Sequence, residues 1–147
     1  MFSPKKNNVR IKNMVSQPEG LHLDFKQSLT NQRKVAKTLL SFANTDGGTI
    51  VVGVSDQKQL IGIDPEEEMY VARTSLETYC HPAFPIDFEV YEVEDGTETK
   101  PGQEKYLLLI HVPKSTRGPH SLRDADQRPV YYKRVFDRSI PFHPDPT

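Results

Sequence analysis

The sequence has few of the features that would place it outside an ordinary reducing compartment. Its only cysteine, Cys80, excludes an internal disulfide, and chains without disulfides are typical of reducing surroundings. No apolar run approaches the roughly 20 residues of a membrane-spanning helix. The basic N-terminal segment also lacks the apolar stretch of a secretory signal. We therefore expect a cytoplasmic protein with no membrane association.

The charge balance argues against a chain that binds polyanions over its whole surface, because the formal net charge is only -1 at pH 7. The distribution along the chain is nevertheless uneven. Acidic residues dominate from Asp64 to Glu98, whereas the segment from Lys114 to Arg134 is mostly basic. This asymmetry is compatible with one basic face on a nearly neutral protein. The alternative is ordinary solvated surface charge.

The Gly47-Gly48 pair does not match a phosphate-binding loop. Such loops follow a strand and precede a helix, with the pattern G-x-x-x-x-G-K-[ST]. Here an apolar helical segment comes first and an apolar strand follows. The five histidines are scattered without zinc-site spacing, and no G-x-S-x-G nucleophile motif occurs. Nucleotide hydrolysis is therefore disfavoured, and the glycines are interpreted as a tight turn.

The hydrophobic periodicity predicts an α+β domain with a mixed, mostly antiparallel sheet and about two helices. Residues 49–56 are apolar on both faces, which indicates a central strand covered on two sides. The expected helices run from Thr30 or Asn31 to about Asn44 and over residues 65–80. The expected strands cover residues 21–27, 49–56, 58–64, 86–94, 105–113 and 130–135, with a polar turn at 95–104 and a basic loop at 115–129.

Composition divides the chain into one domain and two short flanking segments. A flexible basic arm is expected over residues 1–14, and an irregular proline-rich tail over residues 141–147. The domain between them, residues 15–140, is long enough to bury a hydrophobic core.

A carboxylate and a lysine project from the same side of the first expected strand. Asp24 and Lys26 are two residues apart, and side chains at that spacing lie on one face of a strand. In metal-dependent nucleases such a carboxylate holds a divalent ion, here Mn²⁺ or Mg²⁺, while the lysine positions water or stabilises phosphate charge. Glu19 and Asp56 would complete a cluster of three carboxylates. The competing interpretation is a solvated sheet face on which Asp and Lys alternate.

Four segments together resemble a known family. They are "GLHLDFKQS" (20–28), "SFANTDGGTIVVGVSDQKQLIGID" (41–64), "VPKSTRGPHS" (112–121) and "VYYKRV" (130–135). Their order and spacing are similar to those of the Schlafen AlbA-like domain, over roughly residues 17 to 138. The Ala-Asn-Thr-x-Gly-Gly block is the specific part of the match.

The resemblance implies a nucleic-acid-binding fold, commonly described as DNA-binding. As an alternative it implies a metal-dependent endoribonuclease that acts on structured RNA such as tRNA. The three acidic positions of the family fall on Glu19, Asp24 and Asp56, and its motif lysine falls on Lys26. The second acid is usually Glu in the family, so Asp24 is one methylene shorter.

The basic strand and the loop before it are the expected contacts to DNA or RNA. Tyr132 and Arg134 share one side of the strand, which would place a stacking ring beside a guanidinium. The competing interpretation is that Arg134 pairs with an acid such as Asp56 or Asp137. A homo-oligomer, and an assembly module that binds no nucleic acid, stay open as alternatives. The full expected set is Arg117, Arg123, Arg128, Tyr132, Lys133 and Arg134.

Overall fold

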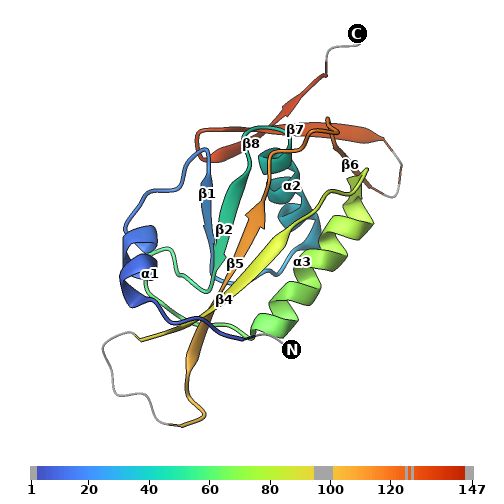
Figure 1. Ribbon diagram of the computed structural model, residues 1–147. Helices are drawn as coiled ribbons and strands as arrows, with labels where there is room; N and C mark the ends of the chain where they lie inside the picture. Colours follow the sequence, from blue (N-terminus) through green and yellow to red (C-terminus); the bar gives the residue numbers. More distant parts are fainter. Residues whose placement is uncertain (1–2, 95–100, 125, 127, 145–147) are drawn as a thin grey trace.

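Two four-stranded sheets and three helices form the part of the chain that the computed structural model describes, residues 3–94, 101–124, 126 and 128–144 (Figure 1). The predicted α+β class is confirmed. The helices are α1 (Asn8–Val15), α2 (Gln32–Ala43) and α3 (Pro65–Tyr79). The first sheet has the strand order β1 (Leu23–Lys26), β2 (Gly48–Val52), β5 (Lys105–Val112), β4 (Asp87–Val93). The second has the order β3 (Cys80–His81), β6 (Ser121–Arg123), β7 (Pro129–Val135), β8 (Arg138–Phe142).

The first sheet is mixed and mostly antiparallel, as predicted. β1 and β2 run parallel, with Asp24 opposite Ile50 and Lys26 opposite Val52. This pairing needs a crossover connection, which α2 provides. β5 pairs antiparallel with both β2 and β4. In β2, Ile50, Val51 and Val52 are fully buried, which confirms the expected central strand covered on both faces.

Helices cover both faces of the first sheet (Figure 1). On one face, Leu39 and Phe42 of α2 pack with Ile50 in the main core, and α3 lies beside α2. On the other face, α1 packs in a second, smaller core. The second sheet also packs against α2, and Tyr132 extends the main core into it. α2 thus contacts both sheets, and eight of its twelve residues are buried.

The segment expected as a flexible basic arm, residues 1–14, contains a helix, because α1 occupies residues 8–15. Ile11 and Val15 are four residues apart, so they lie on one face of a helix, and both are buried. The Asn7 side chain caps the helix by accepting from the backbone N–H of Arg10. The spacing of Ile11 and Val15 is a helical signal in the sequence, but the lysines and asparagines around them favoured the interpretation as an arm.

An ionic cluster around Glu89 of β4 fastens the N-terminal segment to the first sheet. Lys5 Nζ lies 2.7 Å from Glu89 Oε2, and the same oxygen lies 3.5 Å from Arg10 Nη1. On its other side, Glu89 Oε1 lies 2.5 Å from His111 Nε2. The hydrogen bond from Lys5 is the largest of the contributions that lower the pKa of Glu89 to about 2.

Replacing Glu89 with glutamine is expected to reduce stability at neutral pH and to matter less as the pH falls. The folded-state pKa of about 2 lies below the ordinary value of 4.5, so the charged carboxylate stabilises the fold above pH 4.5. That contribution is lost as the pH falls from 4.5 to 2. The difference in melting temperature between the wild type and Glu89→Gln should therefore shrink over this interval. If the difference in melting temperature did not change with pH, the charge of Glu89 would not be what stabilises the contact.

Several segments differ from the predicted elements. β6 lies inside the expected basic loop, and β8 covers the first residues of the expected tail, whose last residues, 145–147, lie outside the described part. Residues 58–64 form no strand, and an isolated bridge between Val54 and Leu60 marks the place of the expected hairpin. Residues 95–100 of the expected turn also lie outside the described part.

Among the described residues, no helix combines the length and apolar character needed to cross a membrane.

Candidate nucleic-acid interface

A buried ion pair forms the centre of the candidate site. Arg134 of β7 donates from Nη2 to Asp24 Oδ1 at 3.1 Å, and the two side chains are 2% and 7% exposed. Arg134 also donates to the carbonyl oxygens of Gly20, at 3.0 Å, and Leu23, at 3.3 Å. Its guanidinium lies 4.7 Å from the centroid of the Phe42 ring. The pair therefore joins β7 of the second sheet to β1 of the first.

The residues that follow α2 join it to the second sheet. Asn44 donates from Nδ2 to the carbonyl oxygens of His120 and Tyr132, both at 2.9 Å. Its Oδ1 accepts from the backbone N–H of His120 at 2.8 Å. Thr45 Oγ1 accepts from the backbone N–H of Arg134 at 2.8 Å. The Asn-Thr part of the family-like block thus positions β7, a role that the sequence analysis did not assign.

The two glycines of the same block allow a close approach of the chain. Gly47 has a φ of 77°, a left-handed conformation that favours glycine. A Cβ there would lie 2.7 Å from the carbonyl oxygen of Val112. A Cβ at Gly48 would lie 2.5 Å from the Phe42 ring. These contacts agree with the interpretation of the pair as a tight turn.

Glu19 lies close to Asp24 and supports the edge of β1. Its Oε2 accepts from the backbone N–H of Phe25 at 2.9 Å. Burial raises the pKa of Glu19, the hydrogen bond from Phe25 opposes this rise, and the nearby Asp24 carboxyl adds to it. Asp24 Oδ2 lies 3.1 Å from Lys26 Nζ, within ion-pair distance. The contact lacks hydrogen-bond geometry, so among the described residues this buried oxygen has no hydrogen-bond partner.

Asp56 does not join Glu19 and Asp24, which corrects the expected convergence of the three carboxylates. The residues after β2 bond through their backbone N–H groups to the Lys26 carbonyl, and the chain then turns back at Ser55. Asp56 is exposed in this turn. In the described part of the chain, no group of three or more His, Cys, Asp or Glu residues is arranged to hold a metal ion. The expected Mn²⁺ or Mg²⁺ ligand set therefore does not fit this geometry.

A basic groove lies beside the ion pair, and we call it the α2–β8 groove. Its volume is about 360 Å³, and five of its lining residues are cationic while two are acidic. Lys34 and Arg138 are exposed, and among the described residues neither has an ion-pair partner. Lys37 Nζ lies 4.9 Å from the centroid of the Tyr132 ring. The groove is lined by Asp24, Lys26, Lys34, Lys37, Thr38, Arg134, Asp137, Arg138, Ser139 and Ile140.

The residues predicted to bind nucleic acid divide into a buried pair and an exposed set. Tyr132 and Arg134 do share one side of β7, but that side faces α2, and both residues are buried. Their selection as surface contacts is therefore corrected. The competing interpretation of Arg134 agrees with the structure, although its partner is Asp24 and not Asp56 or Asp137. The exposed members of the set are Arg117, Arg123, Arg128 and Lys133, and their role stays a prediction.

The sequence analysis did not assign Lys34, Lys37 or Arg138 to the site. Lys34 and Lys37 are three residues apart, so a helical pattern places them on one face, and this signal was available. Arg138 belongs to β8, for which no strand was predicted. The groove therefore depends on the hairpin that β7 and β8 form.

Taken together, these features define an α+β domain in which a buried carboxylate–arginine pair lies beside a basic groove. The sequence matches the family described as Schlafen, AlbA_2 over residues 19–143, and the chain belongs to that family. This membership supports a function related to nucleic acid. No curated protein gives a significant match.

A crystal structure of the DIP2311 protein from Corynebacterium diphtheriae resembles the chain, with a TM-score of 0.55 and 19% sequence identity. The similarity covers 92% of this chain and 30% of that protein. At this level of identity it shows the fold alone. The chain thus corresponds to less than a third of the length of that protein.

Proposed function

We propose that this chain is a nucleic-acid-binding domain whose α2–β8 groove contacts the phosphate backbone. The observation that carries the proposal is the excess of cations in the groove, where five cationic side chains face two acidic ones. The two acids cannot neutralise the groove, because they are outnumbered by the five cations and because Asp24 is shared between Arg134 and Lys26. Membership of the Schlafen AlbA_2 family supports the same function.

The groove cations differ in how available they are to a phosphate. Arg134 is committed to Asp24 and is buried, so its contribution is to hold the hairpin in place. Lys34 and Arg138 are exposed, and a guanidinium and an ammonium are the groups that bind phosphate oxygens most strongly. Lys26 is about one-third exposed, with its charge shared with Asp24. We therefore assign the phosphate contacts to Lys34, Lys37 and Arg138, with Lys26 as a weaker fourth.

Fluorescence anisotropy with labelled oligonucleotides tests this proposal. Three or four phosphate contacts to a single strand should give a plot of log affinity against log salt with a slope of about -2 to -3. A slope near zero, or no binding at low salt, would reject the groove as a phosphate site. It would favour instead the assembly module without nucleic acid.

Cleavage of RNA stays a prediction from the family resemblance. Glu19 and Asp24 are neighbours, but Asp56 is displaced from them and Asp24 is engaged by two cations. No catalytic step through a metal ion follows from this arrangement. Incubation of labelled tRNA with and without Mn²⁺ is the measurement that distinguishes cleavage from binding alone.

A further inference from the structure

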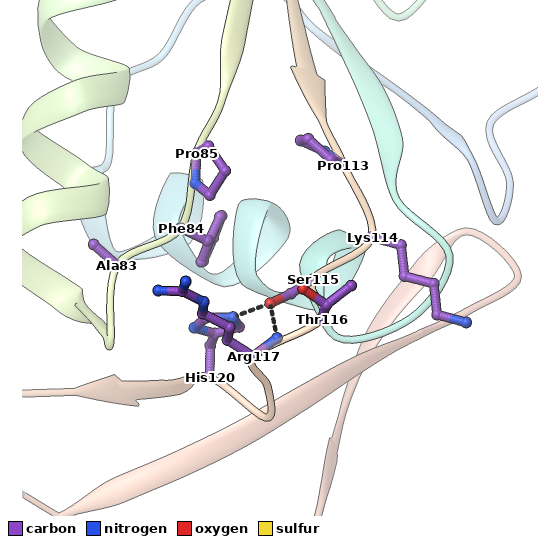
Figure 2. A pocket seen from close by; sticks show the side chains of 9 residues that line it. All are labelled: Ala83, Phe84, Pro85, Pro113, Lys114, Ser115, Thr116, Arg117 and His120. Atoms are coloured by element: carbon purple, nitrogen blue, oxygen red, sulfur yellow. Dashed lines mark hydrogen bonds between the residues drawn. The ribbon is translucent and has the colours of Figure 1, made fainter.

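A second cavity lies at the loop that follows β5, and it shares no lining residue with the groove (Figure 2). Its volume is about 340 Å³, within the range of about 300–1,000 Å³ that is usual for small-molecule sites. Figure 2 shows apolar side chains on one side of it and a serine–histidine pair at its base. The cavity is lined by Ala83, Phe84, Pro85, Pro113, Lys114, Ser115, Thr116, Arg117 and His120.

A chain of hydrogen bonds fixes the ring of His120, which is only 1% exposed. Its Nδ1 lies 2.6 Å from the carbonyl oxygen of Pro82, and a carbonyl can only accept, so Nδ1 carries a proton. In the neutral imidazole the other nitrogen, Nε2, is then an acceptor. Nε2 lies 2.6 Å from Ser115 Oγ, so the serine hydroxyl donates to it. The rings of His120 and Phe84 also meet edge to face, with centroids 4.9 Å apart.

This arrangement makes Ser115 an acceptor toward the cavity. Its only hydroxyl proton is used on His120, and one lone pair of Oγ accepts from the backbone N–H of Arg117 at 3.1 Å. The backbone N–H of Ser115 is itself held by the carbonyl of Ala43 at 2.9 Å. One lone pair of Oγ is left over. A ligand group that meets it must therefore bring its own proton.

The rim of the cavity favours a negatively charged group on the ligand, next to the ligand group that donates to Ser115. The Arg117 side chain lines the cavity together with His120, and Figure 2 draws it across His120 in that view. Among the described residues the Arg117 guanidinium has no ion-pair partner, and Lys114 Nζ lies 3.8 Å from Asp46, a long contact between exposed groups. Phe84, Pro85 and Pro113 supply apolar surface on the same cavity. A ribonucleotide unit has the matching groups: a hydroxyl donor, a phosphate and a flat base.

We propose that this cavity holds one nucleotide of a bound RNA strand and that Ser115 Oγ accepts a hydrogen bond from its 2′-hydroxyl. Arg117 contacts the adjacent phosphate. The proposal rests on the nucleic-acid binding proposed above and adds a choice between RNA and DNA. The 2′-hydroxyl is the group by which a protein distinguishes the two at a given position. His120 acts as a positioning residue, because it orients the Ser115 hydroxyl.

Affinity for oligouridine RNA, compared with the same oligomer carrying 2′-fluoro sugars, tests the proposal at mildly alkaline pH. The 2′-fluoro oligomer keeps its phosphates and its bases but has no 2′-hydroxyl proton to donate. One net hydrogen bond should make the wild type prefer RNA about two- to tenfold. Ser115→Ala should lose this preference while still binding both oligomers with the same salt dependence.

Two further variants serve as controls. Arg117→Ala should weaken both oligomers equally and keep the preference for RNA. Ser121→Ala should keep both affinity and preference, because Ser121 donates to the His81 carbonyl and does not line the cavity. Equal binding of the two oligomers by the wild type, or an unchanged preference in Ser115→Ala, would overturn the proposal while leaving the groove intact. Absence of binding to both oligomers and to a single-stranded DNA of the same length would reject the nucleic-acid function as well.

Discussion

Replacing Arg134 with alanine is expected to lower the free energy of unfolding by about 3–5 kcal/mol. The variant leaves the Asp24 carboxylate, 7% exposed, without its closest buried cation, and it removes the hydrogen bonds to the Gly20 and Leu23 carbonyls. Lys26 compensates only in part, because its contact with Asp24 lacks hydrogen-bond geometry. For a chain of this size the loss corresponds to a decrease in melting temperature of roughly 6–20 °C. Thermal and urea unfolding followed by circular dichroism measure both quantities.

Two variants distinguish the loss of the pair from the loss of any large side chain. Arg134→Lys keeps the charge but not the planar fork that reaches several acceptors, so it should recover only part of the stability. The double variant Asp24→Leu/Arg134→Met removes both charges together and should be more stable than Arg134→Ala, because no unpaired carboxylate is left inside. The salt slope of nucleic-acid binding should stay unchanged in folded Arg134→Lys. A small stability loss combined with a flatter slope would instead make Arg134 a phosphate contact.

The strand at residues 130–135 shows where prediction from sequence reached its limit. Alternation correctly placed Tyr132 and Arg134 on one side and Tyr131 and Lys133 on the other. Each side therefore carries one tyrosine and one cation, so composition does not reveal which side is covered. The contact between α2 and β7 decides this, and such a contact between distant segments leaves no periodic signal.

The expected carboxylate cluster also shows that a strand can be predicted more readily than the path of the chain that follows it. The buried strand before Asp56 was predictable, because Ile50, Val51 and Val52 form an apolar run that is covered on both faces. The direction of the chain after that strand was not predictable. It depends on the turn at Ser55 and on Lys58, whose φ is 64°, an unusual conformation for a residue other than glycine. The turn exposes Asp56 instead of bringing it to Asp24.

The α2–β8 groove was predictable only in part. Lys34 and Lys37 occupy one side of an amphipathic helix that the sequence indicated correctly. Arg138 completes the groove from an edge strand of five residues, one of which is a proline. A proline reduces the strand signal, although edge strands tolerate it, and β8 lies at the edge of the second sheet. The helix half of the groove was therefore visible, and the strand half was not.

Reversing two charges in the α2–β8 groove is expected to weaken nucleic-acid binding more than reversing two exposed charges outside the groove. Lys34 and Arg138 are both exposed and unpaired among the described residues, so Lys34→Glu/Arg138→Glu should fold normally. Each phosphate contact changes the salt slope by about 0.7 on a single strand and about 0.9 on a duplex. Two lost contacts at 0.1 M salt thus lower affinity about 25-fold and about 60-fold respectively, before the added repulsion is counted.

The matched control is Arg128→Glu/Lys133→Glu, which changes the net charge by the same amount on exposed residues outside the groove. A long-range effect of net charge would weaken binding equally in both double variants. Local phosphate contacts in the groove would weaken it mainly in Lys34→Glu/Arg138→Glu and would flatten the salt slope of that variant alone by about 1.4–1.8 units. The reverse outcome, in which the Arg128 and Lys133 variant loses more affinity and more slope, would move the interface to the exposed basic residues predicted from the sequence. Melting temperatures of both variants establish that the comparison is made between folded proteins.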